Sequence, residues 1–247
     1  MEDIYLDYPE WQDTADTVHL FLQMAGKVKV ERSPKRPQWA HVRLYLVPDG
    51  LTTGLIPGDS SPFSILFNFR EHQVEFMNGD GKKVNIPLED GVSVAAFYGQ
   101  FASALEQIGS PTLINVHPQE FYDPLEFDKD DKHHSYDKVA IRKWLENMLF
   151  AYGAMARYLT AFRCKVHYPA YYFGTMDLTC IVFSGEPAPF GKKDPVMEKA
   201  FDERLYECGH IFVFVGIEQT SHQSIASSIL VSTQCSRIVA QVDTMIA

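Results

Sequence analysis

Residues 63–88, FSILFNFREHQVEFMNGDGKKVNIPL, decide the fold, because they contain three apolar runs separated by a short connection and a turn. Residues 63–69 and 73–77 each predict a strand, and residues 78–81, Asn-Gly-Asp-Gly, predict a tight hairpin since these residue types tolerate positive φ angles. Residues 83–88 then complete a meander. Strands that follow one another in hairpins favour an antiparallel sheet over a doubly wound sheet, in which strands alternate with helices.

Toward the N-terminus the sequence predicts one helix and then two strands. Apolar residues recur at helical spacing and predict a helix over residues 14–25, with Gly26 suited to the position after its end. Residues 27–31 and 42–47 alternate with period two, which predicts a strand in each. The apolar face of the helix consists of Trp11, Ala15, Val18, Leu22 and Ala25.

Toward the C-terminus the sequence predicts two further helices, over residues 94–108 and 137–162, separated by an irregular loop at 117–135. The second of these helices is long enough to brace a whole sheet. Its apolar stripe includes Trp144, Met148, Tyr152 and Met155. Further strands are expected at 165–168, 171–183 and 210–215.

Together these elements predict an α+β fold, in which a mainly antiparallel sheet is packed by the long central helix. We expect a single compact domain over residues 1–247. The segments 11–116 and 136–216 echo each other faintly, since each has an amphipathic helix, then Lys-Val, an aromatic residue before a strand and a glycine after it. Duplication into two similar halves and chance both explain this echo.

The composition is that of a soluble globular protein, with 46% hydrophobic and 22% charged residues. A net charge of −10 repels phosphate, so we expect no nucleic-acid partner. Residues 1–11 are acidic and lack the basic start of a secretory signal, and no apolar run approaches the ~20 residues that cross a bilayer. These two features, together with four cysteines that lack the spacing of a metal site, predict a cytoplasmic protein that makes no membrane contact. The sequence does not predict an oligomeric state.

Trp39, His41 and Arg43 are the first candidate ligand-binding residues. Period two places them on one face, where the rings could stack a planar ligand and the arginine could pair with a carboxylate or phosphate. The alternative is an ordinary solvated sheet face. Asp177 interrupts the predicted strand 171–183, so it is either half of a structural ion pair or a general base or ligand anchor.

Residues 128–134, Asp-Lys-Asp-Asp-Lys-His-His, contain the carboxylates and imidazoles that divalent cations prefer. Their spacing matches no ligand motif, and acids just before a helix that begins at Asp137 are more simply explained as a solvated loop near its positive end. The sequence also lacks a serine nucleophile elbow, a phosphate-binding glycine loop and a dinucleotide fingerprint. We therefore expect no metal and no cofactor.

Several short motifs occur together along the chain, and in this combination they resemble a widespread bacterial family of domains of unknown function. The motifs are Trp11/Thr14/Thr17/His19/Gln23, Gly50-Leu51-Thr52-Thr53, His133-x-Ser135-Tyr136-Asp137, Asp177-Leu178 with Phe183-Ser184-Gly185, and Cys208-Gly209. The resemblance spans roughly residues 11–209 and implies no activity, but it adds His133 and Tyr136 to the candidate site residues. Members of that family carry a histidine where this chain has Tyr171 or Tyr172, and a His-Glu pair where it has Glu203 and Arg204. If those histidines act as ligands or bases in the family, this chain lacks them.

Three functions remain open from the sequence. The first is binding of a small aromatic or anionic ligand in a cleft lined by Trp39, His41, Arg43 and Asp177, with residues 117–135 as a lid. The second is an enzyme in which His41 or His133 acts as acid or base and Asp177 orients it. The third is a protein-interaction module that uses exposed aromatic residues such as those at 168–173.

Overall fold

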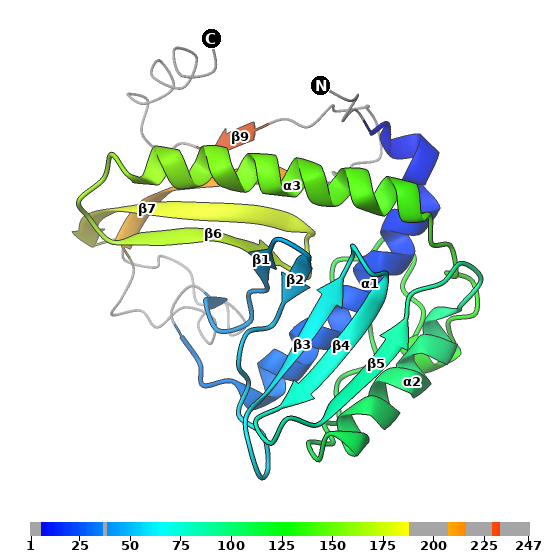
Figure 1. Cartoon of the computed structure of the whole chain (residues 1–247). Coiled ribbons are helices and arrows are strands. Elements are labelled where there is room, and N and C mark those ends of the chain that lie inside the picture. The colour runs from blue at the N-terminus through cyan, green and yellow to red at the C-terminus, as the bar shows by residue number, and fades with distance from the viewer. Residues whose placement is uncertain (1–5, 37–38, 188–206, 216–228, 233–247) are drawn as a thin grey trace.

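The computed structural model of the chain describes residues 6–36, 39–187, 207–215 and 229–232 (Figure 1). In these residues three α-helices pack with two antiparallel sheets, which confirms the predicted α+β class. None of the described helices is both long and apolar enough to cross a membrane.

The N-terminal helix α1, Tyr8–Arg32, is almost wholly buried. Proline in its first turn suits a helix start, and every residue from Thr14 to Lys29 is buried. The predicted helix end at Gly26 and the predicted strand at 27–31 are therefore wrong. The alternation of lysine and valine there does not mark a strand, because α1 is covered on all sides and its lysines are buried together with its valines.

The first sheet is the predicted meander extended by two short strands. Its strands pair antiparallel in chain order, with Phe63 opposite Asn78 across the central pair. Phe63, Ile65 and Phe67 alternate toward the core, as period two requires. The strands are β1 (Tyr45–Val47), β2 (Gly50–Thr52), β3 (Phe63–Asn68), β4 (Gln73–Asn78) and β5 (Lys83–Pro87).

Helix α2, Val94–Gln107, begins and ends close to the predicted positions. Its N-cap is Ser93, whose side chain accepts the N–H of Ala96. Phe97 of α2 stacks on Phe21 of α1, with ring centroids 3.9 Å apart. This contact fixes α2 against the buried helix.

The second sheet comes from the C-terminal part of the chain and is covered by the long helix α3, Lys138–Leu159 (Figure 1). The Asp137 side chain caps α3 as predicted. Three residues of the predicted stripe, Trp144, Met148 and Met155, are buried, so the predicted packing face is confirmed. The strands pair antiparallel in the order β6 (Val166–Tyr172), β7 (Asp177–Pro187), β8 (Glu207–Val215) and β9 (Ile229–Ser232).

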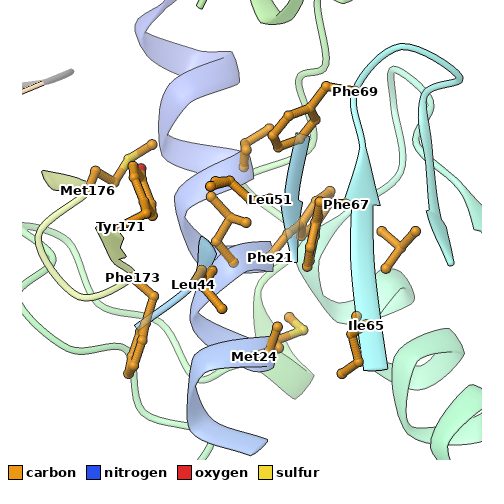
Figure 2. Close-up of a cluster of buried hydrophobic side chains, with 14 of the residues drawn as sticks. Phe21, Met24, Leu44, Leu51, Ile65, Phe67, Phe69, Tyr171, Phe173 and Met176 are labelled. Carbon is orange, nitrogen blue, oxygen red and sulfur yellow. The ribbon is translucent and has the colours of Figure 1, made fainter. Parts of the chain in front are cut away.

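The two sheets meet at Leu44 and Tyr171, whose backbones exchange two hydrogen bonds of 2.8 Å. Figure 2 shows apolar side chains gathered around α1 at this junction, with Phe173 and Met176 next to Leu44 and Tyr171. One cluster of buried side chains therefore joins both sheets to α1.

Two predicted strands have different boundaries in the structure. The strand expected at 42–47 begins only at Tyr45, because the preceding residues form a turn in which Val42 N–H donates to Trp39 O. The strand expected at 171–183 is a hairpin, since β6 ends at Tyr172 and β7 begins at Asp177. The turn contains Gly174 and Thr175, but the apolar residues Phe173 and Met176 on either side of them are buried, so apolar periodicity does not reveal the break.

Candidate functional site

A stripe of buried polar side chains runs along α1. A buried polar group costs free energy unless it forms a hydrogen bond, so such a stripe requires partners from other segments. The structure provides them from the loop before α3 and from residues 43–53. The stripe consists of Thr14, Asp16, Thr17, His19, Gln23, Lys27 and Lys29.

The loop that the sequence predicts as a lid is bound to α1 through its backbone. Gln23 Oε1 accepts the N–H of Gln119 at 2.7 Å, and Gln23 Nε2 donates to Gln119 O at 2.8 Å. Lys27 Nζ donates to His117 O at 2.7 Å. These contacts hold the loop on α1, which argues against a freely moving lid.

Lys29 lies near the C-terminal end of α1 and connects it to the first sheet. Its ammonium donates to Arg43 O and Thr53 O, each at 2.6 Å, and lies 4.7 Å from the centroid of the Tyr45 ring. Burial, followed by the positive charges of Arg43 and Arg36, lowers the pKa of Lys29 to about 8. The charge is thus held in place by carbonyl oxygens and an aromatic face.

Trp39 and His41 stack on each other, with ring centroids 5.4 Å apart and planes inclined by 16°. They lie in the turn before β1 and not on a strand, so the predicted face is corrected although the two side chains do meet. The N–H of Arg36 donates to His41 Nδ1 at 3.2 Å. Burial, and to a smaller extent the charges of Lys29, Lys35 and Arg36, lower the pKa of His41.

Arg43 is buried, and its Nε donates to Ala40 O at 3.4 Å. Arg43 also affects His167, which belongs to β6 of the second sheet. Burial, and after it the positive charges of Arg43 and Lys165, lowers the pKa of His167 to about 4. We call the following residues the basic cluster: Lys29, Arg36, His41, Arg43 and His167.

Asp177 is the first residue of β7 and pairs with Tyr172 across the hairpin. The sequence placed it inside a strand, and the hairpin corrects this. Burial, and after it the charge of Asp177, raise the pKa of Tyr171, whose backbone is bonded to Leu44 beside Arg43. The hairpin and the turn before β1 are therefore neighbours, while the convergence of the Asp177, Arg43 and His41 side chains stays a prediction.

Asp130 and His133 form a buried carboxylate–imidazole pair. His133 Nδ1 donates to Asp130 Oδ2 at 2.8 Å, and Asp130 Oδ1 accepts the N–H groups of Lys132 and His133 at 3.1 Å. Asp130 is 0% and His133 7% exposed, so the interpretation of this segment as a solvated loop is wrong for both. A carboxylate that only accepts places a proton on Nδ1 of His133.

Phe121 connects this pair to α1. The rings of His133 and His19 lie edge-on to Phe121, with centroid distances of 5.3 and 5.6 Å. Phe121 stacks on Tyr122, whose hydroxyl donates to Asp16 Oδ2 at 2.8 Å. Within the described part of the chain, His133 Nε2 and His19 Nδ1 are buried and have no hydrogen-bond partner. We call the following residues the acidic-aromatic site: Asp16, Phe121, Tyr122, Asp130 and His133.

Tyr136 is buried at a third place. Its hydroxyl oxygen lies 3.1 Å from His72 Nδ1, and the two rings meet edge-on with centroids 5.8 Å apart. Burial raises its pKa above the ordinary tyrosine value. The predicted site residues therefore have different surroundings: Trp39, His41 and Arg43 lie together, whereas His133 and Tyr136 contact other partners.

Several residues of these sites are not predicted from the sequence. Lys29 was assigned to a strand, and nothing in the sequence indicates that Asp16 and Tyr122 meet, because they are 106 residues apart. Asp130 and His133 had a visible signal, since a carboxylate and an imidazole three residues apart can bond within one turn. Among the described residues, no group of three or more histidine, cysteine or acidic side chains is placed to hold a metal ion.

A family model matches residues 4–224, which include α1, both named sites and most of the second sheet. The chain belongs to DUF5996, a family of unknown function. This confirms the expected membership in a family of unknown function, over a range that reaches beyond residues 11–209 at both ends. No curated protein and no solved structure matches the DUF5996 chain.

Proposed function

We propose that this DUF5996 protein binds a small aromatic anion at the basic cluster, with Trp39 as the surface on which the ligand ring stacks. The proposal develops the sequence hypothesis of an aromatic or anionic ligand. One observation carries it: among the described residues, every charged group that shifts the pKa of Lys29, His41 or His167 is positive.

Lys29 and Arg43 are both positive and buried, and such groups repel one another because the interior screens charge less than water does. The chain as a whole has ten more acidic than basic residues, so the cluster does not simply follow from a basic composition. A bound anion would relieve this repulsion. Arginine is suited to a carboxylate or phosphate because its guanidinium presents several donors in one plane.

Trp39 supports the aromatic part of the proposal. Its φ angle is +52°, a left-handed conformation that costs a bulky residue roughly 1–3 kcal/mol. Such strain is found most often where a side chain must be held for binding. Here it holds the indole parallel to His41, and the side chain of Trp39 is half-buried, so part of it faces solvent.

Benzoate is the probe that tests this function. Isothermal titration calorimetry should show benzoate binding at low salt, and cyclohexanecarboxylate of the same charge should bind more weakly because it lacks a π face. Arg43→Gln should weaken benzoate binding at least roughly tenfold, as expected for the loss of a charged hydrogen-bond donor. Trp39→Leu should remove the difference between benzoate and cyclohexanecarboxylate.

Arg36→Gln is a third variant, because Arg36 is exposed and its replacement should leave the fold unchanged. Circular dichroism of each variant separates a loss of binding from a loss of folding. If benzoate raises the melting temperature no more than potassium chloride of equal ionic strength, and no heat of binding is seen, the basic cluster is not an anion site.

We also propose a cytoplasmic location without a nucleic-acid partner. Support comes from the net charge of −10 and from two free cysteines in the described part, Cys164 and Cys180. Titration with a thiol reagent tests the cytoplasmic location. The exposed Cys164 should react in the native protein extracted from cells, and Cys180 should react only after unfolding.

A further inference from the structure

We propose that two copies of this chain associate through the outer face of α3, with the helices antiparallel and Phe150 of each copy packed on Gly153 of the partner subunit. Helix α3 packs its buried face on the second sheet (Figure 1), so the opposite face is turned outward. None of its residues belongs to the basic cluster, so the inference does not depend on the proposed anion site. We call the following exposed residues of α3 the outer stripe: Val139, Arg142, Glu146, Phe150, Gly153, Ala154 and Arg157.

The first argument is an exposed aromatic side chain in the middle of the outer stripe. Phe150 is 72% exposed, although α3 has a buried face on which apolar residues pack. Gly153 and Ala154 lie one turn further along the helix and are exposed as well, so the apolar surface continues beside the ring. An exposed apolar patch with charged side chains at its rim is typical of a surface on which another protein packs.

The second argument is the glycine of the outer stripe. Glycine is less favourable than alanine in the interior of a helix. A Cβ atom added to Gly153 would have no neighbour within 4 Å, so nothing in the described part of its own chain explains the missing side chain. A partner that approaches the helix closely does explain it, because an aromatic ring can then lie directly on the backbone.

The spacing of the outer stripe determines how two copies meet. Four of its residues follow one another at intervals of four, three and four, which is the spacing of the seam between two packed helices: Glu146, Phe150, Gly153 and Arg157. These four are symmetric about the point midway between residues 151 and 152. Two antiparallel helices with this point on a twofold axis place Phe150 opposite the partner's Gly153. The same register places Glu146 opposite the partner's Arg157.

Charge complementarity favours this antiparallel register and a second copy as the partner. The register forms two equivalent ion pairs between Glu146 and the partner's Arg157, one on each side of the axis. A parallel pair in register would instead bring together side chains of like charge at both positions. Within the described part of the chain neither Glu146 nor Arg157 takes part in a salt bridge, so both are available to a partner.

The contact is small, so we expect a weak dimer. Residues 144–159 face each other in this register, which corresponds to about 24 Å along the helix axis. One helix pair of this length lies at the low end of specific interfaces, which bury about 1,200–2,000 Å² in total. Each chain has a net charge of −10, but at physiological salt this repulsion is screened beyond about 8 Å, whereas groups in contact still attract.

Sedimentation velocity of the full chain at physiological salt measures the association, at protein concentrations from roughly 1 μM to 1 mM. Phe150→Asp should abolish the dimer, while its circular dichroism stays that of the wild type because the ring is exposed in the monomer. Leu113→Asp is the matched control. Leu113 is 93% exposed but lies in the loop after α2, so this variant should associate like the wild type.

Two charge variants test the register. Glu146→Arg and Arg157→Glu should each weaken self-association at least roughly tenfold, because like charges then face each other across the axis. An equimolar mixture of the two variants should associate about as tightly as the wild type, because each altered side chain then meets an opposite charge. A merely unfolded variant would not show this recovery.

Three results would overturn the proposal. The first is a wild-type protein that stays monomeric up to roughly 1 mM, which would leave the outer stripe to a different partner. The second is a Phe150→Asp variant that associates as tightly as the wild type, because the dimer would then use another surface. The third is a mixture of the two charge variants that associates no more tightly than either variant alone, because the two positions would then not face each other.

Discussion

The ring of Phe173 lies directly on Gly26 of α1: a Cβ atom built on this glycine would be 2.0 Å from Cδ1 of the ring. Gly26 therefore does not end a helix, as its residue type suggests, but allows the β6–β7 hairpin to approach the middle of one. The same contact places the hairpin beside Met24 and Leu44 in the core (Figure 2). The position of the second sheet on α1 depends on the absence of one methyl group.

Gly26→Ala should destabilise the protein by on the order of 2 kcal/mol in chemical denaturation. Overpacking of a core costs about 1–3 kcal/mol, and this exceeds the gain of up to about 1 kcal/mol that alanine brings to a helix interior. Gly153→Ala in α3 is the matched control, because no atom lies within 4 Å of its added Cβ. That variant should be as stable as the wild type or slightly more stable.

A double-mutant cycle identifies the cause. Phe173→Leu alone should destabilise, but in its presence Gly26→Ala should cost much less, because the ring that clashes has gone. Additive free energies in the cycle would show that Phe173 is not the neighbour that matters.

Met148→Asp should cost more than about 3 kcal/mol, because it places an unpaired carboxylate in the buried stripe of α3. Phe150→Asp, two residues further on the same helix, should change the free energy of unfolding by less than about 1 kcal/mol, since Phe150 is 72% exposed. Urea denaturation of both variants measures this difference. Similar losses in the two variants would contradict the assignment of the buried face.

Gln23→Met should loosen the loop before α3 while retaining most of the helix packing. The variant removes two hydrogen bonds to the backbone of Gln119, and each contributes about 0.5–1.5 kcal/mol. Hydrogen exchange of the Gln119 amide should become faster than in the wild type, and exchange in β3 and β4 should stay slow. If the Gln119 amide exchanges at the same rate in both proteins, the loop is held by other contacts.

The elements predicted correctly are those whose signal is local. The 63–88 meander has its turn residues and its alternation within 26 positions, and α3 has its cap at Asp137 and an uninterrupted stripe. The prediction for the C-terminal part of α1 is wrong because Lys27 and Lys29 alternate with valine, as residues of a strand do, although they lie in a helix. Their charges are satisfied by carbonyls of His117, Arg43 and Thr53, which no local pattern reveals.

In the candidate site, too, the correct predictions are those that depend on a local signal. Trp39 and His41 were grouped because they are close in sequence, and they do stack, although in a turn and not on a strand. The burial of His133 was missed because it depends on Phe121 and on the distant helix α1. Long-range neighbours decide whether a charged segment is solvated or buried, and periodicity contains no information about them.

The stability of the protein should fall in acid partly because of His19. Burial lowers the pKa of His19 in the folded state to about 4, from an ordinary value of 6.5, so the unfolded chain binds more protons between these two values. The contribution is therefore fully present above pH 6.5 and is lost as the pH falls toward 4, with a total on the order of 3 kcal/mol. His19→Gln should flatten the dependence of the unfolding free energy on pH within this window, whatever its effect at pH 7. Direct NMR titration of the His19 ring in the native protein is the check, and a midpoint near 6.5 would show that its burial does not contribute to acid sensitivity.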